Sequence, residues 1–195
     1  MLSPKKSLDI LRKTNALLEG HFVLSSGLHS SKYIQCAKLL SHPYLAEKIC
    51  KSLASKIKKK FKKIDLILAP AMGGIIIGYE IGRILKKETI FCERVKGKFT
   101  LRRGFNIRKG MNVLIIEDVI TTGKSSLECV RLIKDSKAKL LGFASLIDRS
   151  SKQTLKIRKK IVSQLKISVP TYKKKKLPKN LISIPVTKPG SRFIK

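Results

Sequence analysis

Blocks of apolar and polar residues alternate along this chain, and the spacing of the apolar residues predicts alternating helices and strands. Residues 113–116 are four branched aliphatic side chains in a row, typical of a strand buried on both faces of a parallel sheet. Between Pro43 and Lys60 aliphatic residues recur every four positions, which predicts an amphipathic helix. The remaining pattern predicts helices over residues 8–18, 74–86 and 125–136 and strands over residues 64–69, 89–93 and 140–147. Beyond residue 147 prolines interrupt the pattern, and we expect a more irregular segment.

The order of these elements indicates the fold class. Alternating strands and helices are typical of an α/β fold, in which a parallel, Rossmann-like sheet carries helices on both faces. A chain of 195 residues, 43% of them hydrophobic, is long enough to bury one substantial core. We therefore expect a single domain.

Lysine-rich runs at residues 56–63, 156–160 and 173–176 contribute to a net charge of +32. Such runs attract polyanions, but aromatic residues make up only 6% of the chain and no nucleic-acid-binding motif is recognisable. We interpret the runs mainly as solvated surface and regard nucleic-acid binding as the alternative. A positive field also raises the rate at which small anionic substrates arrive.

The four cysteines are far apart among aliphatic neighbours and form no C-x-x-C pair. This spacing predicts buried, reduced thiols and no zinc site. The chain has neither the apolar segment of a signal peptide nor a stretch of about 20 apolar residues. We expect a cytoplasmic protein without a membrane anchor.

The most informative motif follows the strand at residues 113–116. Two adjacent carboxylates are expected at its end, where a turn brings both into one cleft and lets them accept hydrogen bonds from vicinal hydroxyls. Hydroxyl groups and backbone amides at the start of the next helix form a cradle for a phosphate dianion. Together the two halves fit a ribose 5-phosphate. The residues of this motif are Glu117, Asp118, Val119, Ile120, Thr121, Thr122, Gly123, Lys124 and Ser125.

This motif allows two other interpretations. The sequence Gly-Lys-Ser suggests a Walker A loop, but Asp118 stands where that motif requires its first glycine, which excludes a nucleoside triphosphatase of this type. The simpler alternative is a buried strand whose two acids cap the following helix.

Two further segments have the chemistry of an anion site. Residues 70–74, Pro-Ala-Met-Gly-Gly, join a predicted buried strand to a predicted helix, where exposed amides bind anions; alternatively the glycines only permit a tight turn. Between Glu93 and Asn112 lies a predicted polar loop with seven cations and two hinge-like glycines. A long basic loop is typical of a lid over an anionic leaving group, and a solvated loop is the alternative.

The motif at residues 117–125 resembles the phosphoribosyl pyrophosphate (PRPP) signature of the type I phosphoribosyltransferases. Further segments look like the orotate phosphoribosyltransferases, and the resemblance covers nearly the whole chain. These segments are residues 21–30, 33–37, 70–74, 93–94, 101–105 and 148–149. The resemblance implies the type I fold with a small hood from about residues 1–40 and the C-terminal segment. It also implies a core over about residues 43–150 and a flexible lid over about residues 95–110.

The resemblance implies an activity and a set of site residues. The reaction would transfer 5-phosphoribosyl from PRPP to orotate in pyrimidine (UMP) biosynthesis, giving orotidine 5-monophosphate and pyrophosphate. Mg²⁺ would be held through substrate and waters, with no direct protein ligand. The enzyme would be a homodimer whose subunits share their lids. The implied roles in PRPP binding fall to Arg94, Lys98 and the residues 117–125, and those in catalysis to Lys98 and Asp118. Pyrophosphate binding is implied for Ala71, Met72, Gly73 and Gly74 with a cis Ala71–Met72 bond, and orotate binding for Thr121 and Arg149.

The chain also departs from the pattern it resembles. Ser25, Gly73, Val95 and Thr100 stand where many members carry a lysine or a histidine. We hypothesise that Arg102 or Arg103 in the lid supplies the missing positive charge. A purine-using phosphoribosyltransferase and an RNA-binding regulator on the same fold remain the alternative functions.

Overall fold

The computed structural model describes residues 1–24, 27–151 and 156–189. Its core is a six-stranded sheet in the order β5-β4-β3-β6-β7-β8, parallel except for β5. The strands are β3 (Leu66–Pro70), β4 (Glu88–Val95), β5 (Lys98–Thr100), β6 (Asn112–Ile120), β7 (Lys139–Asp148) and β8 (Ile161–Lys166).

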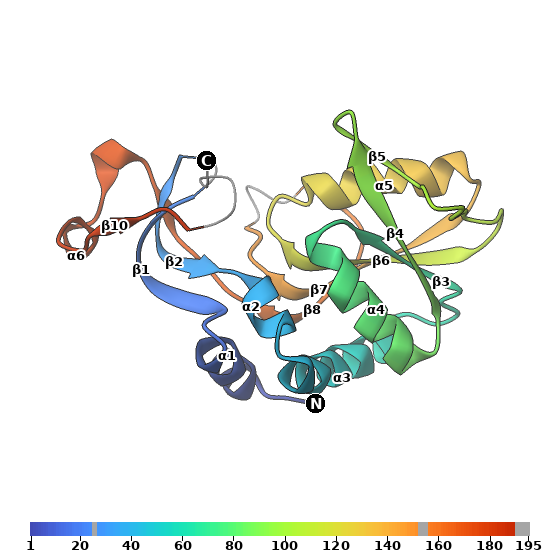
Figure 1. The fold of residues 1–195 in the computed structure, drawn as a ribbon, viewed down its shortest axis with the longest axis horizontal. Coiled ribbons are helices and arrows are strands. Elements are labelled where there is room, and N and C mark those ends of the chain that lie inside the picture. The colour runs from blue at the N-terminus through green and yellow to red at the C-terminus, as the bar shows by residue number, and fades with distance from the viewer. Residues whose placement is uncertain (25–26, 152–155, 190–195) are drawn as a thin grey trace.

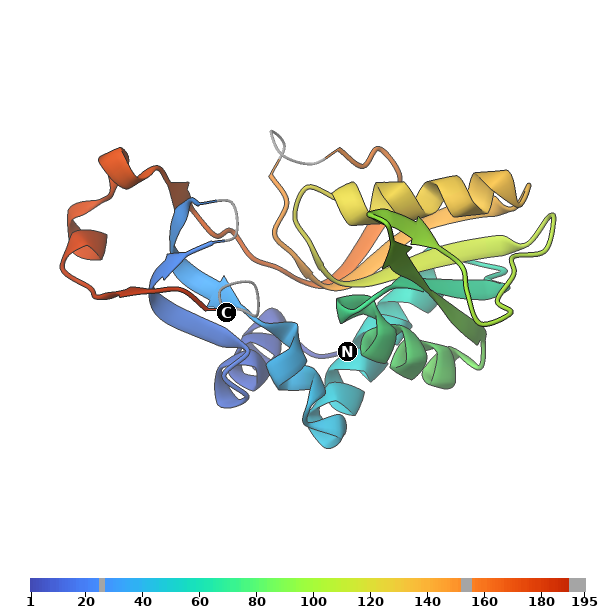
Figure 2. The same ribbon diagram turned by 45° about the horizontal axis from the view of Figure 1, so that its top comes forward.

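Helices cover both faces of this sheet. Helix α5 (Lys124–Asp135) lies on one face, and α3 (Pro43–Lys60) and α4 (Gly73–Leu85) lie on the other (Figures 1 and 2). Side chains of the central strands alternate between two apolar clusters: Val113 and Ile115 pack on the α5 side, whereas Leu114 and Ile116 pack on the side of α3 and α4. The α/β fold and the doubly buried strand are confirmed.

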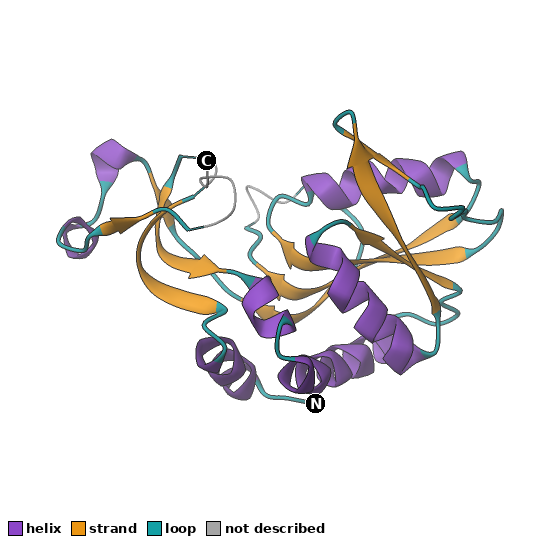
Figure 3. Ribbon diagram, viewed as in Figure 1, coloured by secondary structure: helices purple, strands orange, loops and turns teal. Residues whose placement is uncertain are grey.

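A second, four-stranded sheet joins the two ends of the chain beside this core (Figure 3). Its strands, in the order β10-β1-β2-β9, are β1 (Leu17–Val23), β2 (His29–Ile34), β9 (Thr171–Tyr172) and β10 (Val186–Thr187). The buried rings of His21 and His29 are joined by a 2.6 Å hydrogen bond between Nε2 and Nδ1. The other helices are α1 (Pro4–Lys13), α2 (Cys36–Leu40), α6 (Lys179–Ile182) and the 3₁₀ helix η1 (Lys174–Lys176).

Helix α3 matches its prediction at both ends, but the helix predicted over residues 8–18 is wrong at both ends. Ser3 caps α1 through a hydrogen bond from Lys6 N–H, so the helix begins earlier, at Pro4. It ends at Lys13 because Asn15 adopts a left-handed conformation with φ 52°. Leu17 and Leu18, expected in the helix, begin β1.

The predicted strand at residues 113–116 is also too short. Strand β6 continues to Ile120, because Glu117 and Ile120 still pair with Ser145 and Asp148 of β7. No turn therefore separates the aliphatic run from the two carboxylates. The segment after residue 147 is less irregular than expected, since β8 adds a sixth strand to the core. Its pattern was missed because the buried positions include a polar residue, Gln164.

The segment between Glu93 and Asn112 is not a plain polar loop. Strands β4 and β5 form an antiparallel hairpin in which Arg94 pairs with Phe99. Phe99 and Ile107 are buried in the apolar cluster on the α5 side. Apolar anchors therefore interrupt the cationic segment.

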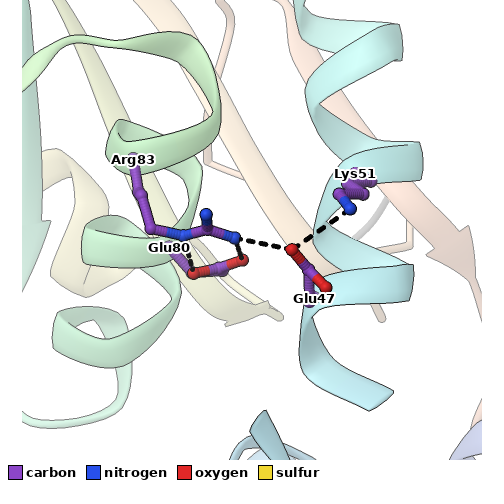
Figure 4. A network of polar contacts seen from close by, with 4 residues as sticks. All are labelled: Glu47, Lys51, Glu80 and Arg83. Carbon is purple, nitrogen blue, oxygen red and sulfur yellow. Dashed lines mark hydrogen bonds and ion pairs between the residues drawn. The ribbon is translucent and has the colours of Figure 1, made fainter. Parts of the chain in front are cut away.

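Charged side chains tie α3 to α4 on the outside of the core (Figure 4). The guanidinium of Arg83 donates to Glu80 at 2.8 Å and to Glu47 at 2.9 Å, and Lys51 lies 3.1 Å from the same Glu47 oxygen. Hydrogen bonds from Lys51 and Arg83 lower the pKa of Glu47. The network holds α4 against α3, and the first turn of α4 borders the site described below. Within the described residues no helix is both long enough and apolar enough to cross a membrane.

Candidate active site

A cavity of about 340 Å³ opens at the carboxyl ends of β3 and β6. Ligands of open α/β sheets bind at this edge of the fold. The cavity is lined by Pro70, Ala71 and Gly73 after β3, by Phe99 of β5, and by all residues from Glu117 to Ser126. The structure thus brings the predicted ribose-phosphate residues, Glu117 to Ser125, together with Ala71 and Gly73 of the predicted pyrophosphate loop, whereas Met72 and Gly74 do not line the cavity.

Glu117 continues the side of β6 that faces α5. Its Oε1 accepts a 2.9 Å hydrogen bond from the Ser126 hydroxyl, and both side chains are buried. Burial raises the pKa of Glu117 to about 7 from its ordinary value near 4.5, although the hydrogen bond from Ser126 opposes the shift. The carboxylate therefore ionises only near neutral pH in the free protein.

Asp118 points to the opposite side of the strand, toward the start of α4. Its Oδ1 accepts a 2.8 Å hydrogen bond from the Val119 N–H, and burial raises its pKa. A β carbon on Gly73 would meet the Asp118 carboxylate at 2.6 Å. Among the described residues neither Asp118 nor Glu117 has an ion-pair partner, although the chain carries a net charge of +32. The two acids are thus available to a hydroxylated or cationic ligand.

The loop between β6 and α5 has the geometry of an anion site. Gly123 caps α5 in a left-handed conformation with φ 73°, and a β carbon there would meet Ile157 at 2.5 Å. Helical hydrogen bonding starts with Leu127 N–H donating to Gly123, so the amides of Ser125 and Ser126 in the preceding turn remain for a ligand, while that of Lys124 is engaged within the loop. The Thr121 and Thr122 side chains are exposed at the cavity rim, and Thr122 Oγ accepts from the Lys124 N–H.

The loop after β3 is fixed by close packing. Ala71 N–H donates to the Cys92 carbonyl at 2.8 Å, and the Ala71–Met72 peptide bond is cis, as the resemblance implied. A β carbon on Gly74 would stand 3.0 Å from the Ile116 carbonyl. Close packing therefore leaves no room for a side chain at Gly73 or Gly74, as the tight-turn alternative expected. Gly73 also borders the cavity. Met72 is 82% exposed and points away from the core.

Arg149 follows β7, and its N–H donates to the Ile120 carbonyl at 2.8 Å. Its side-chain Nε is buried without a hydrogen-bond partner, and burial lowers the pKa of the guanidinium. The suggested pairing with Asp148 is absent among the described residues, where Asp148 accepts from Ser150 N–H and lies 4.0 Å from Lys166. Arg149 is close enough to Tyr33 and Cys36 to interact with them electrostatically. Within the part of the chain that the structure describes, a half-buried cation without an ion-pair partner therefore lies where the second sheet meets the core.

The cationic residues assigned to the lid do not line the main cavity. Arg94 forms a 2.6 Å ion pair with Glu128 of α5 and donates to the Gly97 carbonyl. Lys98 lines a neighbouring cavity of about 540 Å³ on the outer side of α5. Arg102 and Arg103 lie 3.7 and 3.5 Å from Glu93. Ser25 lies outside the described residues.

Two residues that sequence reasoning missed line the cavity, Ser126 and Phe99. The proposed motif stops at Ser125, one position before Ser126. A signal was available, because the third position of a helix that follows a phosphate loop turns back toward the strand. Phe99 carried no such signal, since only the hairpin brings it to the cavity.

The donor chemistry of the cavity suits a hard cation such as Mg²⁺. Glu117 and Asp118 offer carboxylate oxygens, which Mg²⁺ prefers together with phosphate oxygens and water. Within the described residues no three His, Cys, Asp or Glu side chains cluster to hold a metal by themselves. The residues present therefore fit an ion that arrives with a phosphorylated ligand.

Comparisons with known proteins agree with this geometry. Residues 37–176 match the family model described as a phosphoribosyl transferase domain. The chain is 46% identical to the orotate phosphoribosyltransferase of Parvibaculum lavamentivorans over 99% of this chain and 100% of that protein. Its fold is similar to that of the orotate phosphoribosyltransferase of Aeropyrum pernix, with TM-score 0.69, 23% identity and coverage of 82% and 92% of the two chains. It is also similar to the adenine phosphoribosyltransferase of Saccharomyces cerevisiae, with TM-score 0.65, 19% identity and coverage of 81% and 99%.

Proposed function

Because the chain belongs to the phosphoribosyltransferase family and is 46% identical to an orotate phosphoribosyltransferase over nearly its full length, we propose that it transfers 5-phosphoribosyl from PRPP to orotate. The products are orotidine 5-monophosphate and pyrophosphate. One observation supports the choice of base: the half-buried guanidinium of Arg149 has a buried Nε that no described residue hydrogen-bonds. Orotate has a carboxylate that uracil, adenine and hypoxanthine lack, and a guanidinium fork matches a carboxylate.

Different residues of the cavity bind different parts of PRPP. Glu117 and Asp118 accept hydrogen bonds from the ribose hydroxyls, while the amides and hydroxyls from Thr121 to Ser125 hold the 5-phosphate. The loop from Ala71 to Gly74 receives the pyrophosphate. Displacement at the anomeric carbon develops positive charge on the ribose, so the nearby carboxylates stabilise the transition state more than the ground state. Asp118 is the candidate proton acceptor.

Mg²⁺ fits the proposal as an ion that neutralises the departing pyrophosphate. Glu117 and Asp118 would hold it through the ribose hydroxyls and waters. In the lid, cationic side chains would also neutralise the charge of the leaving pyrophosphate. We propose Lys98 and Arg94 for this role.

A homodimer with shared lids is part of the proposal. Arg94 and Lys98 lie away from the main cavity of their own chain, which suits residues that serve a neighbouring subunit. Met72, Ile76 and Tyr79 are exposed at helical spacing along one side of α4, and Tyr44 of α3 is exposed as well. An apolar strip of this kind beside the pyrophosphate loop is a suitable contact for a second copy.

The four free, buried cysteines fit a reducing compartment, and we propose that the enzyme is cytoplasmic. Burial raises the pKa of Cys36 and of Cys50, the latter to about 12, so neither thiol is ionised near neutral pH. They are unreactive core residues in the proposed mechanism.

The experiment is an ultraviolet assay of orotate consumption with PRPP and Mg²⁺, run in parallel with uracil, adenine and hypoxanthine. We expect turnover of orotate alone. Turnover of a purine would favour a purine-using enzyme, and salt-dependent RNA binding without turnover of any base would favour an RNA-binding regulator.

A further inference from the structure

The hydrogen bond between Ser126 and Glu117 closes the ribose-phosphate loop at its base. Glu117 ends the buried part of β6, Ser126 lies in the first turn of α5, and the residues between them line the cavity. Ser126 is 1% exposed and Glu117 is 8% exposed, so the 2.9 Å hydrogen bond from Oγ to Oε1 is shielded from water. Hydrogen bonds to a buried carboxylate are among the stronger ones in proteins.

Ser126 differs from other serines of the described helices in the group to which its hydroxyl donates, although Ser7 also accepts from the Gln164 side chain and Ser52 from the Leu2 N–H. Ser7, Ser55 and Ser136 each donate to the backbone carbonyl four residues earlier, at 3.0, 3.0 and 2.8 Å. Those bonds stay within one helix. Ser126 instead donates to a side chain on another element, and that side chain lines the cavity. A purely helical role does not explain this choice of partner.

We propose that Ser126 is a positioning residue: it holds Oε1 of Glu117 and thereby leaves Oε2 for a ribose hydroxyl of PRPP. The proposal rests on the function proposed above only in naming PRPP as the ligand. Without the Ser126 hydroxyl, nothing else among the described residues holds the Glu117 carboxylate, which is then free to rotate. Burial already raises the pKa of Glu117, so loss of this hydrogen bond also favours its protonated form.

The chain offers a matched control. Ser145 of β7 pairs in register with Glu117, and its hydroxyl is likewise fully buried. Its Oγ has no hydrogen-bond partner among the residues that the structure describes. Ser126→Ala and Ser145→Ala therefore remove the same atom from equally buried positions beside the same carboxylate, and only the first removes a hydrogen bond to it.

The test is calorimetric titration of the full-length protein with PRPP and Mg²⁺ across pH 5.5 to 8.5. For Ser126→Ala we expect PRPP affinity about tenfold weaker at neutral pH, and an acid limb of binding displaced to higher pH. Ser145→Ala should match the wild type, and Ser126→Thr, which restores a hydroxyl, should recover most of the affinity. In a Glu117→Gln background the Ser126→Ala change should have little further effect, because both act through one carboxylate.

Wild-type affinity and pH dependence in Ser126→Ala would overturn the proposal. So would an equal loss in Ser145→Ala, or full additivity with Glu117→Gln. If Ser126→Ala is unstable, the comparison of Ser126→Thr with Ser126→Cys decides, since only threonine retains the hydroxyl and equal affinities would overturn the proposal. Because the readout is PRPP binding, a protein that binds PRPP but does not convert orotate would refute the proposed function without affecting this test.

Discussion

Gly73 lies against the carboxylate of Asp118, so closely that a β carbon on Gly73 would stand 2.6 Å from Oδ2 and 2.8 Å from Cγ. The two residues come from different connections of the sheet, the loop after β3 and the end of β6. Their contact joins the proposed pyrophosphate loop to the proposed ribose site. The identity of residue 73 and the orientation of Asp118 are therefore coupled.

Gly73→Ala should displace the Asp118 carboxylate and lower kcat at least tenfold, since small displacements of a catalytic group have large effects on rate. It should also lower the melting temperature, because the added methyl group overlaps the carboxylate. Asp118→Ala removes the overlapping atoms, so the two changes should be clearly less than additive in stability. Additive losses of stability would show that the contact with Asp118 is not the cause.

Asp118→Asn keeps the shape of the side chain and removes its charge. We expect turnover to fall by an order of magnitude or more, because the transition state gains positive charge beside this carboxylate. Asp135→Asn is the control, since Asp135 is exposed at the end of α5 and forms only a 3.7 Å pair with Arg131. Turnover close to the wild-type value in Asp118→Asn would remove this residue from the catalytic set.

Glu117 should make stability depend on pH. Its pKa is about 7 in the folded protein and near 4.5 without burial, so the folded form binds a proton more tightly than the unfolded form. Its contribution to the free energy of unfolding is fully present below pH 4.5 and is lost as the pH rises through about 7. The loss is on the order of 3 kcal/mol. Urea unfolding of wild type and Glu117→Gln between pH 4.5 and 8 measures it, and a difference between them that is independent of pH would contradict the assignment.

The sequence pattern correctly predicted those elements that are determined by residues close together in the chain. The aliphatic run at residues 113–116 indicated a doubly buried strand, and the amphipathic spacing defined α3 at both ends. The phosphate loop was recognisable because its glycine, hydroxyl groups and helix start are consecutive in the chain. Pairing between distant strands was not predictable in this way. Strand β6 continues past Glu117 because β7 pairs with it, and β8 forms on the far side of β7.

The same distinction applies to the candidate site. Ser126 and Phe99 reach the cavity through tertiary packing, and the sequence alone did not assign them. The positions of Arg94 and Lys98 outside the main cavity follow from the Arg94–Glu128 ion pair and the β4–β5 hairpin. Residue type predicted that these side chains bind anions, but it did not predict which cavity they face.

Arg102 and Arg103 were proposed to replace cations that the lid lacks. Both lie near Glu93, whose side chain is 23% exposed, but their own side chains are 59% exposed, so each can meet a phosphorylated ligand. We expect Arg102→Ala or Arg103→Ala to raise the KM for PRPP about tenfold with little change in melting temperature. Arg131→Ala, another exposed arginine, should leave the KM unchanged. Unchanged PRPP affinity and turnover in both lid variants would refute the proposed replacement.

Arg149 should be unfavourable for the stability of the free protein and required for recognition of the base. Among the described residues its buried Nε has no hydrogen-bond partner, and a desolvated, unpaired donor of a cation is destabilising until an anion arrives. Arg149→Met keeps much of the apolar stem, so the melting temperature of the free protein should stay equal or rise. The kcat/KM for orotate should fall about a hundredfold, because the substrate carboxylate loses its counter-charge. Saturating orotate should then raise the melting temperature of the wild type and not that of the variant, whereas PRPP alone should raise both. A variant that melts lower and keeps its kcat/KM for orotate would show that Arg149 serves the fold and not the base.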